Sequence, residues 1–156
     1  MTPAVSLPAH PAPWFSLTLS DGRTLSYAEY GDPQGESLVL LHGTPGSRLD
    51  FEFWAEALAA HGLRGIAVDR PGMGRSSAHP QRTLLGWAQD VRALADHLGL
   101  MAFSVLGASG GGPHALACGQ ALPGRVRQVV LVASGVPIET PHFTRKMGWK
   151  VVDKKY

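Results

Sequence analysis

The chain has 156 residues, of which 44% are hydrophobic and 17% are charged. This length and composition are typical of one globular domain with a hydrophobic core, and they exclude an intrinsically disordered chain. The net charge of +2 is too small to indicate a nucleic acid or a membrane surface as the partner.

The N-terminal segment, residues 1–14, contains four prolines and no basic residue, and it predicts an extended arm. It has no apolar run of signal-peptide length, and no stretch of the chain approaches the ~20 apolar residues of a membrane span. The single cysteine, Cys118, excludes an internal disulfide and is typical of a small buried side chain. We therefore expect a cytoplasmic protein that contacts no membrane.

A hairpin is expected next. Residues 15–19 and 24–30 both alternate apolar and polar side chains, which is the period of a β-strand. Asp21-Gly22 between them is a typical hairpin turn. The two strands are therefore expected to pair antiparallel.

Three strand–helix units and a last strand follow the hairpin. Continuous apolar runs indicate strands that are buried on both faces, and a 3.6-residue period indicates helices. Thr83 is the expected N-cap of the second helix, and Gly99 is its expected stop. This alternation predicts an α/β fold, with a mostly parallel sheet, an N-terminal antiparallel hairpin and helices on both faces. The strands are expected at residues 37–41, 65–68, 103–106 and 126–133, and the helices at 49–60, 83–98 and 115–122.

The third unit contains a G-x-S-x-G sequence, from Gly107 through Ser109 to Gly111, between its strand and its helix. Such a turn is typical of a nucleophile elbow, where the serine is held in a strained backbone conformation. Side chains at the flanking positions would obstruct the close approach of helix and strand. The helix start supplies free N–H groups beside the serine. Glycine-rich turns also bind phosphates or serve only as tight turns, so this motif alone leaves those alternatives open.

Two other motifs also follow buried strands: residues 42–46, His-Gly-Thr-Pro-Gly, and residues 69–76, Asp-Arg-Pro-Gly-Met-Gly-Arg-Ser. With the elbow, in this order and spacing, they make residues 15–140 resemble the α/β-hydrolase family. The resemblance implies that Ser109 is the nucleophile. It also implies an oxyanion hole formed by the backbone N–H groups of Thr44 and Gly110, since Pro45 has no N–H.

We interpret the remaining polar and aromatic candidates as structural. No metal and no cofactor are expected, because the seven histidines show no metal-ligand spacing and the elbow chemistry needs neither. His42 is expected to hold the oxyanion loop by hydrogen bonds, His114 to lie on the helix without a catalytic role, and Asp69 and Arg70 to tie two loops together. Trp54 and Trp87 are expected in the core, and Asp90 and Asp96 on the solvated face of their helix.

The sequence departs from the family after the elbow. In the family, a catalytic acid and a histidine follow the serine beyond further strands and a lid. Here the later acids are Glu139 and Asp153, the histidine beyond the last expected strand is His142, and none of these follows a further strand. We therefore expect an incomplete α/β-hydrolase fold, with its N-terminal part at residues 15–137. Residues 138–156, which hold all four lysines, are expected to be the start of a lid or a foreign basic tail.

Two functions stay open. The first is a hydrolase that acts on small acyl substrates, through an ester, amide or related bond, with a small molecule as its partner. The alternative is a truncated, catalytically inactive hydrolase-like fragment or binding module that lacks the acid and the histidine. The last strand includes the uncharged, β-prone run at residues 129–133, so we also expect self-association through an exposed strand edge.

Overall fold

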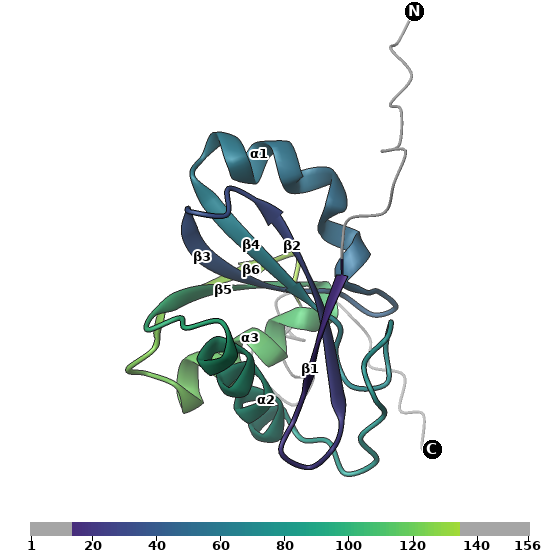
Figure 1. Ribbon diagram of the computed structural model, residues 1–156. Coiled ribbons are helices and arrows are strands. Elements are labelled where there is room, and N and C mark those ends of the chain that lie inside the picture. Colours follow the sequence, from purple (N-terminus) through teal and green to yellow (C-terminus); the bar gives the residue numbers. More distant parts are fainter. Residues whose placement is uncertain (1–13, 135–156) are drawn as a thin grey trace, which may run out of the picture.

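The computed structural model describes residues 14–134, which form a six-stranded sheet in the order β1-β2-β4-β3-β5-β6 (Figure 1). Strand β2 is antiparallel to both of its neighbours, β1 and β4, and the other neighbouring strands pair parallel. The expected α/β class, the N-terminal hairpin and the mostly parallel remainder are confirmed. The strands are β1 (Trp14–Thr18), β2 (Thr24–Gly31), β3 (Glu36–Leu41), β4 (Leu63–Val68), β5 (Phe103–Ala108) and β6 (Val126–Val132).

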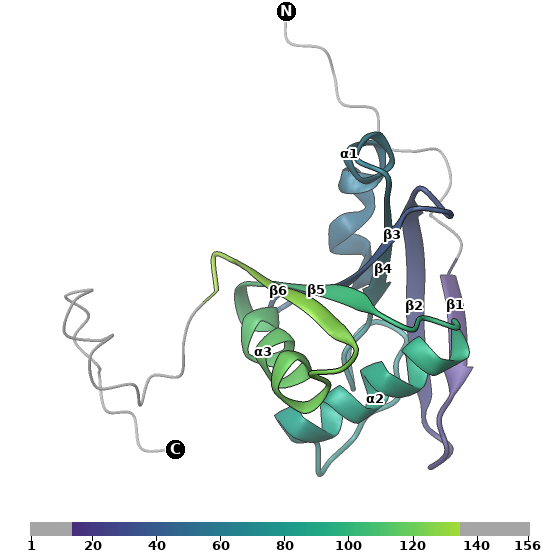
Figure 2. The same cartoon turned by 90° about the vertical axis from the view of Figure 1, so that its left-hand side faces the viewer.

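Helices cover both faces of the sheet, as expected. Helix α1 lies on one face, and α2 and α3 lie on the other, which is clearest in the view of Figure 2. Two short 3-10 segments, η1 and η2, precede α1 and α3 in the chain. The helical segments are η1 (Arg48–Trp54), α1 (Ala55–Ala60), α2 (Leu84–His97), η2 (Ser109–Gly111) and α3 (Gly112–Ala121).

The sheet separates two hydrophobic clusters. Along β3, Val39 and Leu41 point into the larger cluster, which is covered by α2 and α3, and Leu40 points into the smaller one, which contains Phe51 and Leu58. This alternation is the two-residue period of a strand. All three β3 side chains are essentially inaccessible to solvent, which explains why the strand has a continuous apolar sequence.

The helix expected at residues 49–60 is in fact two segments, the 3-10 segment η1 followed by α1. In η1, the rings of Phe51 and Trp54 meet edge to face with centroids 5.5 Å apart. A 3-10 helix brings residues three apart into line, so this aromatic contact favours the tighter winding. Residue spacing alone did not distinguish the two helix types. The arm expected at residues 1–14 is also one residue too long, because Trp14 already belongs to β1.

Helix α2 begins and ends where the sequence indicates. The side chain of Thr83 accepts a hydrogen bond from the N–H of Gly86, and Gly99 follows the helix with a φ of +67°. Trp87 is buried as expected, and Trp54 is partly buried against the smaller cluster.

The expectation that Asp90 lies on the solvated face of α2 is wrong. Asp90 is 6% exposed, and Arg23 from the β1–β2 hairpin donates two hydrogen bonds to its carboxylate, at 2.7 and 2.8 Å. Helical spacing places Asp90 beside the buried Trp87 and Val91, and the buried carboxylate is tolerated because it has a fully engaged cationic partner. Asp96 is solvent-exposed, as expected.

Within residues 14–134, β6 pairs only with β5, and its large apolar side chains Val130, Leu131 and Val132 are 39–43% exposed. Self-association through this strand stays a prediction. Size-exclusion chromatography with light scattering should show a mass that rises with protein concentration, and Val130→Lys should lower it, because a charge on an edge strand opposes strand pairing. A monomer at all concentrations would contradict the prediction.

The helices within residues 14–134 include none that is long and apolar enough to cross a membrane. Cys118 in α3 is fully buried, and burial raises the pKa of its thiol to about 12. Residues 1–13 of the expected arm, the segment 138–156, Glu139, His142 and Asp153 lie outside the described residues.

Candidate active site

Ser109 stands at the turn between β5 and α3, where its side chain is exposed to solvent. Its φ of +49° lies in the left-handed region that a serine rarely adopts. Gly111 allows this turn because a Cβ atom there would lie only 2.2 Å from the carbonyl oxygen of Leu41. A Cβ at Gly107 would lie 2.8 Å from the Cβ of Ala115. The two glycines thus let α3 start directly against β3 and β5 with Ser109 at the tip of the turn.

The loop after β3 lies against this turn. Strands β3 and β5 are parallel neighbours, with Leu41 opposite Gly107, so their following loops emerge at the same edge of the sheet. A Cβ built at Gly43 would lie 3.3 Å from the Cβ of Ser109, and one built at Gly110 would lie 3.3 Å from the backbone nitrogen of Thr44. The structure therefore brings Ser109, Thr44 and Gly110 together. Their roles as nucleophile and oxyanion donors stay predictions.

His42 is fully buried and uses both ring nitrogens to hold loops. Its Nε2 accepts a hydrogen bond from the backbone N–H of Arg70, so Nδ1 carries the proton and donates to the carbonyl of Gly43 at 2.8 Å. Burial, and then the positive charge of Arg70, lower the pKa of His42. A neutral histidine with both nitrogens engaged cannot take a proton from Ser109. The expectation that His42 holds the oxyanion loop by hydrogen bonds is confirmed.

Asp69 also ties two loops together, as expected. Its buried carboxylate accepts hydrogen bonds from the backbone N–H of Arg48 at 2.7 Å, from the guanidinium of Arg48 at 2.6 Å and from the backbone N–H of Arg75 at 2.9 Å. Arg48 begins η1 after the β3 loop, and Arg75 lies in the loop after β4. One carboxylate thus fixes the loop after β4 against the segment that follows the oxyanion loop.

Arg70 reaches further into the site than the sequence indicated. Its Nη2 donates hydrogen bonds of 2.7 Å both to the carbonyl oxygen of Gly43 and to Oγ1 of Thr44. Its Nη1 lies 3.4 Å from Nε2 of His114. The signal that could have predicted this is topological, because Arg70 follows β4, a parallel neighbour of β3, and so emerges at the same sheet edge as Thr44.

His114 completes a hydrogen-bonded connection around the candidate oxyanion hole. Its Nδ1 lies 3.1 Å from the carbonyl oxygen of Gly110 and therefore donates to it, which leaves Nε2 to accept from Arg70. Burial, and then the charge of Arg70, lower the pKa of His114 to about 4, so the ring is neutral at pH 7. The sequence placed His114 on the helix but gave no sign of these contacts.

Within residues 14–134, no histidine or carboxylate is hydrogen-bonded to the hydroxyl of Ser109. The two nearby histidines, His42 and His114, are turned to other partners. The described part of the chain also contains no group of three metal-ligating side chains. The described residues therefore supply the candidate nucleophile and candidate N–H donors, and none of them is a hydrogen-bonded proton acceptor for Ser109.

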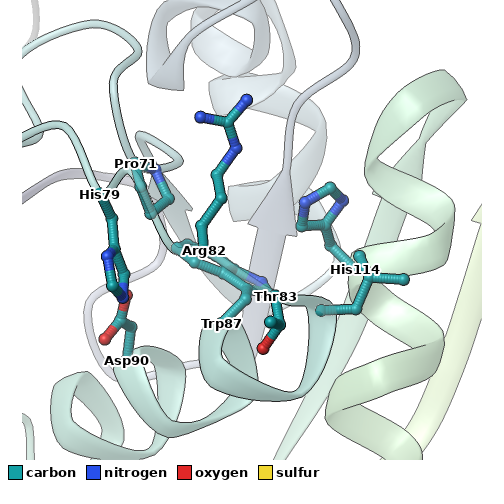
Figure 3. A pocket seen from close by; sticks show the side chains of 8 residues that line it. Pro71, His79, Arg82, Thr83, Trp87, Asp90 and His114 are labelled. Carbon is teal, nitrogen blue, oxygen red and sulfur yellow. The ribbon is translucent and has the colours of Figure 1, made fainter.

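A pocket of about 250 Å³ lies beside His114 (Figure 3). It lies between the loop after β4, the start of α2 and the first turns of α3. The edge of the Trp87 ring packs against His114 with centroids 6.1 Å apart. His114 thus lines the pocket and also contacts Gly110 of the candidate oxyanion hole. The lining of the pocket includes Pro71, His79, Arg82, Thr83, Trp87 and His114.

Together, the mostly parallel sheet and the serine at a tight strand–helix turn define an α/β protein with the architecture of a nucleophile elbow. Residues 36–153 match the family model described as the alpha/beta hydrolase fold. The chain therefore belongs to the α/β-hydrolase family.

Among curated proteins, the chain is similar to a non-heme chloroperoxidase from Streptomyces lividans, with 38% identity over 85% of this chain and 49% of that protein. It is also similar to a proline iminopeptidase from Arabidopsis thaliana, with 31% identity over 80% of this chain and 33% of that protein. A solved structure of a probable hydrolytic enzyme from Pseudomonas aeruginosa PAO1 superposes with a TM-score of 0.72 and 31% identity, over 79% of this chain and 42% of that chain. The chain thus spans about half or less of these relatives, and their names differ in reaction.

Proposed function

We propose that the chain carries the nucleophile half of a serine hydrolase that acts on small acyl substrates. The observation that carries the proposal is the meeting of three groups: Ser109 at φ +49°, and the backbone nitrogens of Thr44 and Gly110 beside it. Preorganised N–H donors beside a nucleophile stabilise the oxyanion that forms during acyl transfer. The α/β-hydrolase relatives support the same class.

The proposed reaction begins with attack of the Ser109 Oγ on the carbonyl carbon of the substrate, and the hydroxyl proton passes to a base. The carbonyl oxygen becomes an oxyanion between the N–H groups of Thr44 and Gly110. As the carbonyl re-forms, the bond to the leaving group breaks and that group takes up the proton. Water then releases the acyl group as an acid and restores the Ser109 hydroxyl.

A fluorophosphonate reagent is expected to modify Ser109: the Ser109 Oγ displaces fluoride from phosphorus, and the phosphoryl oxygen, which gains negative charge in the transition state, lies beside the N–H donors. The adduct is located by mass spectrometry, with Ser109→Ala as the variant that loses labelling completely. Ser104→Ala, which changes a half-buried serine on β5, is the matched control and should label like the wild type. Labelling at Ser104 or Ser134 with Ser109 untouched would refute the assignment.

A second candidate, a catalytically inactive hydrolase-like binding module, is favoured by one observation: no base among residues 14–134 contacts Ser109. A general base contributes about 10²- to 10⁴-fold to such a reaction. Turnover of p-nitrophenyl butyrate above background that disappears in Ser109→Ala supports the hydrolase. Labelling at Ser109 without turnover supports the inactive module.

A further inference from the structure

The pocket beside His114 carries an unbalanced positive charge. The guanidinium of Arg82 is exposed at the pocket, and Figure 3 shows its side chain between those of Pro71 and His114. Arg82 forms no ion pair within residues 14–134. The acidic residue of the lining, Asp90, is already neutralised by the two hydrogen bonds from Arg23. Arg82 is thus the cation that an entering group would meet.

A second cation lies just behind the pocket wall. Arg70 is only 6% exposed, has no carboxylate partner within the described chain, and its Nε is buried without a hydrogen-bond partner. A buried guanidinium without a counter-anion is costly in free energy. Burial, and then the positive charge of Arg82, lower the pKa of Arg70, so the two cations repel each other. An anion placed at Arg82 would relieve this repulsion.

We propose that this pocket binds the carboxylate of the substrate's acyl group, so that the chain acts on acyl compounds whose acyl chain ends in a carboxylate. This inference rests on the proposed function, since it names the substrate class of the Ser109 site. His114 links the two places: its ring faces the pocket, and its Nδ1 donates to the carbonyl of Gly110. The proposal therefore places the carboxylate of the acyl chain at Arg82 and its carbonyl at Ser109, with the chain running past His114.

The size and the walls of the pocket fit a short aliphatic acid. Its volume of about 250 Å³ is many times the roughly 15 Å³ that one water molecule needs by the same measure. Pro71, Leu84 and Trp87 supply apolar surface for methylene groups. The guanidinium of Arg82 supplies charged N–H donors with which a carboxylate can pair.

Binding is tested without catalysis by titrating the ¹⁵N-labelled protein with glutarate at pH 7 and constant ionic strength, while the indole N–H signal of Trp87 is followed by NMR. Glutarate is expected to shift this signal saturably, and the neutral isostere glutaramide is expected to bind at least about tenfold more weakly, because it cannot form a charge-assisted hydrogen bond. Arg82→Gln should weaken glutarate binding by about the same factor. Arg127→Gln removes the same charge from the exposed face of β6 and should leave binding unchanged.

Equal binding of glutarate and glutaramide, tighter binding of inorganic phosphate than of glutarate, or full binding by Arg82→Gln would each overturn the proposal. The titration therefore tests the anion site, and fluorophosphonate labelling at Ser109 separately tests the nucleophile. If the protein binds glutarate but is not labelled at Ser109, the anion site is supported and the proposed hydrolysis is refuted.

Discussion

Asp69→Ala is expected to destabilise the fold by about 3–5 kcal/mol, because it leaves the buried guanidinium of Arg48 without its counter-charge. The side chains of Asp69 and Arg48 are 0% and 7% exposed, so water cannot replace the lost carboxylate. The backbone N–H groups of Arg48 and Arg75 lose their acceptor in the same change. Urea unfolding followed by tryptophan fluorescence measures the free energy of unfolding.

Asp96→Ala is the matched control. Asp96 also pairs with an arginine, Arg125 at 2.8 Å, but its side chain is 54% exposed. An exposed ion pair contributes less than about 1 kcal/mol, so this variant should unfold close to the wild type. Equal losses of stability in the two variants would show that burial is not what makes Asp69 important.

Gly111→Ala is expected to cost about 3 kcal/mol, because the new Cβ would lie 2.2 Å from the carbonyl oxygen of Leu41 and 2.8 Å from that of His42. Both neighbours are backbone atoms of the β3 strand and its loop, so relief requires α3 to move away from β3. That movement would also separate Gly110 from Thr44. We therefore expect slower fluorophosphonate labelling of Ser109 together with the loss of stability.

Gly124→Ala controls for the loss of a glycine as such. A Cβ at Gly124 meets no atom within 4 Å, so the change should leave stability unchanged or raise it by up to about 1 kcal/mol through the unfolded state. Normal labelling of Ser109 in Gly111→Ala, at wild-type stability, would contradict the close packing of α3 on β3.

The secondary structure and the candidate site were largely predictable because they depend on local signals. Apolar runs located the strands, Thr83 and Gly99 located the ends of α2, and the glycines around Ser109 marked the turn. These features need only near neighbours in the chain. The placement of the loops of Thr44 and Arg70 at one sheet edge then follows from the parallel pairing of β3 with β4 and β5.

The long-range pairings could not be predicted from the sequence. Asp90 and Arg23 are 67 residues apart in the chain, and nothing in the local sequence of α2 shows that a hairpin side chain will neutralise this carboxylate. The contact of Arg70 with Thr44 and His114 likewise depends on side-chain conformations in two loops and in helix α3. The pocket at Arg82 arises from the packing of α2 beside α3, which periodicity does not specify.

The reactivity of the Cys118 thiol can be used to measure how often α3 opens from the sheet. This thiol is the single thiol of the protein, it is fully buried in α3, and burial keeps its pKa near 12. A disulfide reagent such as dithionitrobenzoate reacts with the thiolate, so the folded chain reacts only when α3 separates from the sheet. The rate of colour release therefore measures how often α3 opens from the sheet in water, without denaturant. In a variant whose α3 packs more loosely, the turn that holds Ser109 is also less firmly held. Such a variant should show a faster thiol reaction even where its circular dichroism spectrum is unchanged.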